Sequence, residues 1–287
     1  MSKQRKNETP SRTPSGLHIE IERAVRGSTD HQVSDTRARA QELALNALSL
    51  DDTSEQLELA VKAVVLDPRC TDALVILADI FEEVEDYIEA MYLITLRAAE
   101  DLGQEVFQQA RGHFWEAVET RPYMRARLHL ALALHEAGMN NQAIAEFEGI
   151  LDLNANDNLG ARFSLLALYF ETGKLDLASS LLLRFPDDSS TQFAWFRLLN
   201  ALISDDEAGA RGELERARNR NKYVESYLTG RKHLPDRLPE NYRPGDATDA
   251  IISAFEIHKA WEKYPVALGW LMEHEIPREK KERKGKR

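Results

Sequence analysis

Apolar residues recur at intervals of three to four along most of the chain, the spacing that places them on one face of an α-helix. The clearest case lies at 120–158, where one apolar-periodic segment covers Arg121–Glu136 and a second covers Asn141–Leu153. Gly138 stands between them, and glycine readily adopts the positive φ that ends one helix and turns the chain into the next. This stretch therefore predicts an antiparallel helix pair. One pair alone cannot bury its apolar faces, so we expect the unit to recur.

The unit does recur, at a period of about 34 residues. Predicted units cover 37–70, 71–104, 124–157 and 159–192, and a less regular pair follows at 190–218. In each unit, apolar residues occupy places at which the helices are expected to approach closely: Leu43, Ala44, Ala60 and Ala63; Leu74, Leu77, Ala78, Phe81, Ala90 and Ile94; Leu130, Ala131, Leu134, Ala143 and Phe147; Leu165, Leu166, Tyr169, Ala178 and Leu182; Phe193, Trp195, Phe196, Leu199 and Leu202. This spacing resembles the tetratricopeptide (TPR) repeat. It predicts an all-α fold, a TPR-type α-solenoid of about four to five helix pairs whose stacking buries one continuous core.

Two segments depart from the period. An additional helix is expected at 105–119, ending before Pro122, because helices usually stop just before a proline. At 223–246, three prolines and two glycines exclude regular helix from most of the segment. Apolar periodicity returns in a helix at about 246–263 and a shorter one at 265–273. We interpret these C-terminal elements as a loop-plus-helix cap.

The predicted domain organisation has four parts. Residues 1–35 form a polar and basic arm, which we expect to be disordered apart from one segment that could dock, the short alternating stretch Leu17–Ile21. The helical-repeat domain covers 36–222 and the capping segment covers 223–273. A basic disordered tail, 274–287, ends the chain.

The charge is distributed unevenly. The net charge is −11, but residues 1–16 carry +3 and residues 277–287 carry +5, which leaves −19 on the remainder. An acidic body argues against nucleic-acid binding by the folded part, because phosphates are neutralised by Lys and Arg. The basic tail could contact RNA, an acidic membrane or an acidic protein, or it could be a solvated terminus.

Cysteine usage and hydropathy bear on the compartment. Cys70 is the single cysteine, which excludes an internal disulfide and is typical of a buried small apolar residue. No apolar run reaches the roughly 18 residues that span a bilayer, and the N-terminus lacks the apolar segment of a signal peptide. These features predict a cytoplasmic protein with no transmembrane segment.

The chain contains no recognisable catalytic motif. A phosphate-binding glycine loop, an HExxH motif and a GxSxG nucleophile elbow are all absent. Cys70 has no second cysteine for a thiolate metal site, and His129 and His135 are six residues apart, on different sides of a helix. We therefore expect no enzymatic activity, no metal and no cofactor.

The first helix of each TPR pair lines the concave face of such arrays, so residues of these helices are candidates for partner binding. The positions expected to face the groove are Ala38, Gln41, Leu45 and Leu48 in the first unit; Asp72, Val75, Asp79 and Glu82 in the second; Arg125, Leu128, His129, Leu132 and His135 in the third; and Phe163, Ser164, Ala167, Phe170 and Glu171 in the fourth. Asp79 and Glu82 would make one end of this groove acidic, and they argue against the carboxylate clamp found in some TPR proteins. At the other end, His129 and His135 on one helix are followed by Phe163 and Phe170 on the next. Such a surface would accept an extended or helical peptide with basic and apolar anchors. Both phenylalanines could instead belong to the core.

A concentrated basic-aromatic cluster completes the candidate set: Arg121, Tyr123, Arg125 and Arg127. Arg162, in the next unit, could reach back to Asp157 or across to the acidic neighbours of this cluster. Arg125 is four residues from Arg121 and hence on the same helix face, while Tyr123 projects elsewhere. The cluster could bind an anion or an acidic peptide. Alternatively, its arginines form salt bridges between repeats, with Glu116, Glu119 or Asp157 as the nearest acidic residues in sequence.

Four segments carry a family resemblance: TRPYMRA (120–126), LDLNANDN (151–158), YLTGRKHLPDRLPENYRPGD (227–246) and AWEKYPVALGWL (260–271). They resemble the suppressor-of-tumorigenicity-seven family and its bacterial TPR relatives over about 114–271. The resemblance implies a helical-repeat protein without known catalysis. Animal members of the family are described as membrane proteins, an attribute not carried over because this sequence has no spanning segment.

Together these features predict a non-enzymatic TPR scaffold or adaptor that binds a protein or peptide through its concave groove. Two alternatives stay open. One is a regulatory or assembly factor that contacts RNA or an acidic membrane through its basic tail. The other is a hydrolase whose site lies in the 223–246 loop.

Overall fold

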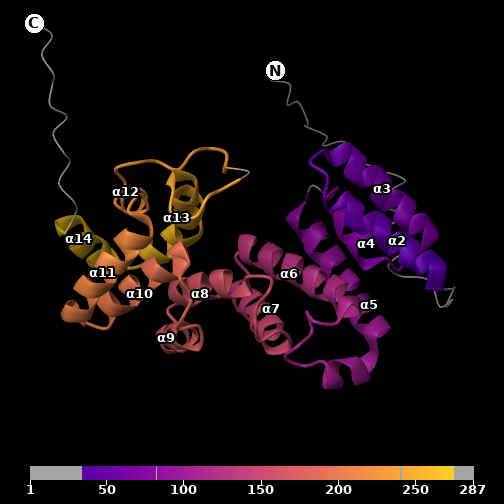
Figure 1. Ribbon diagram of the computed structural model, residues 1–287, viewed down its shortest axis with the longest axis horizontal. Coiled ribbons are helices and arrows are strands. Elements are labelled where there is room, and N and C mark those ends of the chain that lie inside the picture. The colour runs from indigo at the N-terminus through magenta and orange to yellow at the C-terminus, as the bar shows by residue number, and fades with distance from the viewer. Residues whose placement is uncertain (1–33, 82, 240, 275–287) are drawn as a thin grey trace, which may run out of the picture. The chain divides into compact units, whose positions relative to one another are not determined.

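The computed structural model describes residues 34–81, 83–239 and 241–274, and throughout these ranges the regular elements are helices (Figure 1). The prediction of an all-α chain is confirmed. In chain order the elements are α2 (Ser34–Ala47), α3 (Thr53–Leu66), α4 (Thr71–Ala78), α5 (Val84–Gln109), the 3-10 helix η1 (Val118–Thr120), α6 (Arg121–Glu136), α7 (Asn140–Leu153), α8 (Ala161–Thr172), α9 (Leu175–Arg184), α10 (Thr191–Ile203), α11 (Glu207–Asn221), α12 (Glu225–Leu228), α13 (Ala247–Glu262) and α14 (Pro265–Glu273).

The chain divides into two compact units, residues 1–159 (unit 1) and 160–287 (unit 2). In unit 1, α2 packs against α3 and α6 packs against α7; in unit 2, α8 packs against α9 and α10 against α11. The two segments first identified from the apolar pattern, 121–136 and 141–153, coincide with α6 and α7 to within one residue. The predicted arm and tail fall almost wholly at 1–33 and 275–287, outside the described residues.

Three of the helix pairs are joined by the same tight turn. Gly138, Gly173 and Asp205 each have positive φ, at 73°, 74° and 55° respectively. In each turn the following residue donates its backbone N–H to a carbonyl five positions back, as Met139 does to Leu134 at 2.8 Å. This bond satisfies an otherwise unpaired carbonyl at the helix end. The predicted role of Gly138 is confirmed.

The close-approach positions predicted from the repeat pattern lie in the core. All of them except Leu43, Phe81 and Leu202 are buried, and those three are half-buried. Small residues permit the close contacts: Ala44, Ala60 and Ala63 are completely inaccessible where α2 meets α3. The predicted burial of Cys70 is also confirmed, and burial raises the pKa of its thiol to about 12.

The helix predicted at 105–119 is wrong over most of its length. Instead α5 continues to Gln109 across Gly103, whose φ of 74° and ψ of 159° break the helical path inside the element. Glycine is the residue that tolerates this conformation, because it has no Cβ. From 110 to 117 the chain forms turns, with Gly112 also at positive φ.

This turn segment is held by α7 instead of forming a helix of its own. Phe114 donates its backbone N–H to the Leu153 carbonyl at 2.9 Å, and Ala155 donates to the Gly112 carbonyl at 3.0 Å. The Phe114 ring is fully buried. Tertiary contacts therefore override the helical periodicity of this stretch.

In unit 2 the helix α13, which precedes the last helix α14, packs against α8 and α10. The Tyr264 hydroxyl, just beyond α13, donates to the Phe170 carbonyl at 2.7 Å, and the Phe170 ring stacks on Phe196 at 5.2 Å. Trp261 and Trp195 meet edge to face, both fully buried. Aromatic side chains therefore form both contacts, and such rings contribute much of the buried area of a core.

A buried carboxylate ties the start of α13 to α10 and α11. Asp249 accepts hydrogen bonds from the Thr191 hydroxyl (2.7 Å), the Asn221 amide (3.0 Å), the Gly245 backbone N–H (2.7 Å) and the Ser253 hydroxyl (3.2 Å). The residue is 4% exposed. Four donors satisfy the charge, which would otherwise be costly to bury.

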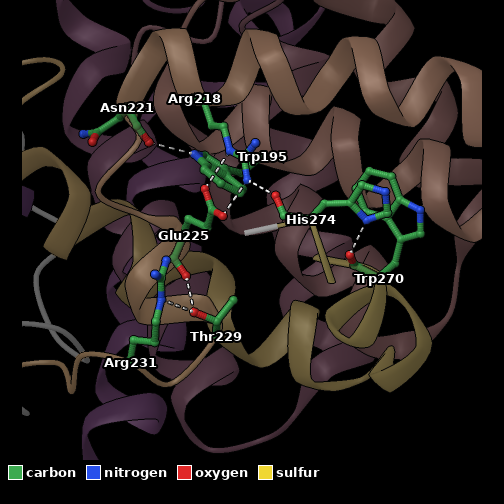
Figure 2. Close-up of polar contacts among 8 residues, drawn as sticks. All are labelled: Trp195, Arg218, Asn221, Glu225, Thr229, Arg231, Trp270 and His274. Atoms are coloured by element: carbon green, nitrogen blue, oxygen red, sulfur yellow. Dashed lines mark hydrogen bonds and ion pairs between the residues drawn. The ribbon is translucent and has the colours of Figure 1, made fainter. Parts of the chain in front are cut away.

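A second polar cluster holds the end of α11, the short helix α12 and the end of α14 (Figure 2). Arg218 forms a bidentate pair with buried Glu225, both bonds at 2.7 Å, and also donates to the His274 carbonyl. The Thr229 hydroxyl donates to the Glu225 carbonyl at 2.8 Å. Planar two-point contacts of this kind fix geometry as well as charge.

Candidate functional site

A groove of about 800 Å³ opens in unit 1 between α2, the loop before α4, α5 and the start of α6. Its lining residues are Arg37, Ala38, Gln41 and Leu45 from α2; Asp67, Arg69, Cys70 and Thr71 around the start of α4; Ala98, Asp101, Leu102 and Val106 from α5; and Val118, Glu119, Arg121, Pro122, Tyr123 and Arg125 from η1 and α6. The groove thus brings Arg121, Tyr123 and Arg125 of the predicted cluster beside the predicted groove positions of α2.

Part of the groove wall is aliphatic and open to water. Val118 is 64% exposed and Leu45 is 46% exposed, and both belong to the lining of the groove. On α5, Leu102 and Val106 are half-buried on either side of the break at Gly103. Covering aliphatic surface of this kind is favourable by roughly 25 cal/mol per Å².

Tyr123 forms the inner wall of the groove. Its side chain is 7% exposed and packs edge to face on Phe107 at 5.2 Å and on Phe114 at 6.1 Å. Burial raises the pKa of its hydroxyl above the usual range.

Arg121 and Arg125 both form cation–π contacts with the Trp115 ring. Their guanidinium carbons lie 5.4 and 6.0 Å from its centroid. Arg121 also donates Nε–H to the Trp115 carbonyl at 2.9 Å. Within the described residues this is the one hydrogen bond of its guanidinium, so the terminal nitrogens stay available to a ligand. Arg37 is similarly open: its side chain is 60% exposed and lies 3.7 and 3.8 Å from Asp67 and Asp101.

Arg125 is bound much more tightly than Arg121. Its Nε–H donates to Asp72 Oδ1 at 2.7 Å and a terminal nitrogen donates to Oδ2, while the Gln41 amide donates to the same Oδ2 at 2.6 Å. The Asp72 side chain is 1% exposed. One carboxylate therefore joins α2, α4 and α6. Arg125 thus forms a salt bridge between repeats, as predicted, but its partner is Asp72 instead of Glu116, Glu119 or Asp157.

Arg127, on the same helix, was also expected to form a salt bridge between repeats, but it pairs within its own unit. Its Nε–H donates to Glu146 Oε2 on α7 at 2.6 Å. This ion pair lies between the two helices of one pair.

A second group of charges surrounds Asp101 on α5. Arg69 forms a hydrogen-bonded ion pair with its carboxylate, and Arg97 lies 3.9 Å away. Partial burial raises the pKa of Asp101 above its usual range, and the arginines at 69, 97 and 37 offset part of that effect. The groove lining carries four arginines against three carboxylates, in a chain whose net charge is −11.

His129 belongs to a polar cluster further along α6. The Tyr87 hydroxyl lies 3.3 Å from His129 Nδ1 and also forms a hydrogen bond with Asp79. Burial lowers the pKa of His129 below its usual range, with Arg125 acting in the same direction and Asp79 and Asp72 opposing it. Desolvation raises the pKa of Asp79, and the nearby His129 and Tyr87 counteract this.

Other predicted site residues of unit 1 are not placed in the groove. His135 lies in the last turn of α6 and is half-buried. Glu82 lies outside the described residues.

The predicted site residues of unit 2 lie among core and ion-pair contacts. Arg162 donates to Asp188 at 2.7 Å and its guanidinium lies 4.2 Å from the centroid of the Phe163 ring. Phe163 is half-buried against Phe193, and Phe170 is fully inaccessible beneath Tyr264 and Phe196. The alternative of a core role thus describes Phe170. A partner could reach its ring only if the contacts of Tyr264 and α13 were broken.

Several residues of the groove were not found from the sequence, notably Arg37, Leu102, Val106 and Val118. The expected helix at 105–119 hid the last two, because it would have placed them on regular helical faces. Gly103 and Gly112 were the available signals, since positive φ at both redirects the chain around the groove.

The described residues hold no group of three or more His, Cys, Asp and Glu side chains arranged for a metal ion. Likewise, no helix in the described ranges combines the length and apolarity needed to cross a membrane. Comparison with models of known protein families gives no match, and comparison with curated proteins gives none either.

Proposed function

We propose that this protein is a non-enzymatic scaffold with TPR-type helical repeats, and that it binds a protein or peptide partner in the groove of unit 1. The observation that supports this most is the exposure of Val118 and Leu45 in a recess that also holds the open guanidinium groups of Arg37 and Arg121. Aliphatic anchors for one part of a ligand and cations for another define a peptide-sized recognition site.

The chemistry of the groove favours a partner with aliphatic side chains next to carboxylates. Arg121 can still donate hydrogen bonds from its terminal nitrogens, and arginine suits carboxylates because of its planar fork. This differs from the basic and apolar ligand that the acidic pair at 79 and 82 suggested, since Asp79 is engaged with Tyr87 and lies outside the groove lining.

The architecture supports the same proposal. Gln41, Asp72 and Arg125, predicted to share the concave face of successive first helices, do meet through hydrogen bonds. In a TPR-type arrangement these helices line the ligand-binding side. The likeness to the suppressor-of-tumorigenicity-seven family agrees with a scaffold role.

The test uses the full chain and a partner captured with it from its native cell. Val118→Asp places a carboxylate on the groove wall, so we expect the Kd for that partner to rise at least tenfold, about 1.4 kcal/mol. Leu183→Asp is the matched control, because Leu183 on α9 is 78% exposed and belongs to unit 2. Equal affinities of Val118→Asp and the unaltered protein would contradict the proposal.

A further inference from the structure

The groove of unit 1 lies where the described chain begins. Its wall includes Arg37 and Ala38 in the first turn of α2, and the helix starts at Ser34. The residues that precede α2 are therefore tethered beside the groove whatever conformation they adopt.

One segment of that N-terminal stretch has the chemistry that the groove recognises. Leu17–Glu22 reads LHIEIE, with aliphatic residues at 17, 19 and 21 and carboxylates at 20 and 22. In an extended peptide, the alternating positions project to opposite sides. The aliphatic set matches the exposed surface of Val118 and Leu45, and the carboxylates match the guanidinium groups of Arg37 and Arg121.

We propose that residues 17–22 occupy the groove of their own molecule and compete there with the external partner. The inference deepens the proposed function and rests on the groove being a ligand site. The protein would then be self-inhibited until a partner displaces this segment.

The tether makes such competition effective. Eleven residues, 23–33, separate the segment from α2. A linker of this length reaches at most about 38 Å, and short linkers give effective concentrations in the millimolar range. Even a weak segment would therefore be bound most of the time in cis.

The experiment measures binding of a fluorescein-labelled peptide, residues 15–22 with blocked termini, to full-length protein. In unaltered protein the internal segment competes, so binding should be weak. Ile19→Asp with Ile21→Asp removes the internal competitor, and we expect it to tighten binding of the labelled peptide at least tenfold. The control, Thr13→Asp with Ser28→Asp, adds the same charge outside the segment and should behave as the unaltered protein.

Adding Val118→Asp to the Ile19→Asp, Ile21→Asp protein should abolish binding and thereby locate the peptide in the groove. The inference is overturned if the labelled peptide does not bind, if the unaltered protein and the Ile19→Asp, Ile21→Asp protein bind it equally, or if Val118→Asp has no effect. The intramolecular inference is also overturned if the unaltered protein is a dimer and the Ile19→Asp, Ile21→Asp protein is a monomer. That result would show that residues 17–22 of one copy occupy the groove of a second copy.

The two proposals can fail separately. Loss of partner affinity in Val118→Asp, with no binding of the labelled peptide, would leave the proposed function standing and remove self-inhibition. Peptide binding that depends on Val118, with partner affinity that does not, would leave residues 17–22 as the occupant of the groove, but it would remove partner binding there and, with it, the competition.

Discussion

Arg125 joins three helices of unit 1 through the single buried carboxylate of Asp72. Arg121, one helical turn before it, also contacts the Trp115 ring, but its guanidinium donates only one hydrogen bond within the described residues, to the Trp115 backbone carbonyl. Two arginines one helical turn apart thus have different roles. Arg125 stabilises the unit, whereas Arg121 keeps terminal donors for a ligand.

Arg125→Ala should therefore lower the free energy of unfolding by roughly 3–5 kcal/mol, because it leaves the buried carboxylate without its cation. Arg121→Ala should cost about 1 kcal/mol, the net value of one hydrogen bond. Chemical denaturation of both variants measures the difference. Equal stability of the two would show that the Asp72 pair contributes no more than a surface contact.

His129 gives a pH-dependent prediction. Burial lowers its pKa in the folded protein, whereas in the unfolded chain the imidazole should titrate near 6.5. The unfolded state then binds more protons, so this group's contribution to stability is complete above pH 6.5 and is lost as the pH falls through the lower folded pKa.

The imidazole signals of His129, followed by NMR across pH 5 to 8, should give a midpoint below 6.5. The His129→Gln protein should lose stability less steeply than the unaltered protein on acidification below about pH 6.5. A midpoint at or above 6.5 would contradict the burial of this side chain against Tyr87.

Helix α5 is a single element with a non-helical residue inside it. Val84–Gln109 runs as a single element, yet Gly103 has a backbone conformation that other residues rarely adopt. The break separates Leu102 from Val106, both of which line the groove. The local backbone at Gly103 therefore shapes the site.

Gly103→Ala should lower the free energy of unfolding by about 1–3 kcal/mol, since an L-residue is strained at this φ and ψ although a Cβ would meet no neighbour. Gly212→Ala is the matched control. Gly212 lies inside α11 with ordinary helical φ and open space around its Cα, so alanine there should stabilise by up to about 1 kcal/mol. If thermal unfolding showed that both variants are more stable than the unaltered protein, the non-helical backbone conformation at Gly103 would be contradicted.

The helices themselves were largely predictable because the apolar period is a local property. The bounds of α6, α7, α13 and α14 follow the sequence pattern to within one residue. The exception is 110–117, whose backbone forms hydrogen bonds with the end of α7 instead of forming a helix. A contact with Leu153, some 40 residues away, cannot be deduced from the spacing of apolar residues.

At the level of the complete chain, the candidate site shows the same limit. The pattern placed Gln41 and Arg125 at the groove, where both lie, but it also placed Asp79, His129 and His135 there, and these do not line it. It could not supply ion-pair partners 53 residues apart, as Arg125 and Asp72 are, or the return of α13 onto α8 and α10. Those depend on how helices pack, which the repeat period alone does not determine.

The division into two units assigns the proposed binding role to one of them. Unit 1 holds the recess with exposed aliphatic and cationic groups, while in unit 2 Phe170 of α8 is buried against Tyr264 and Trp195 of α10 is buried against Trp261 of α13. A partner should therefore contact residues of unit 1 first.

Site-specific photo-crosslinking in the native cell tests this most directly, with benzoylphenylalanine placed in the full chain at Val118 or at Leu183. We expect one partner to be crosslinked from position 118 but not from position 183, and the product to disappear when Arg121→Glu is added. Crosslinking of the same partner from position 183 alone, or equally from both, would contradict binding in the groove of unit 1.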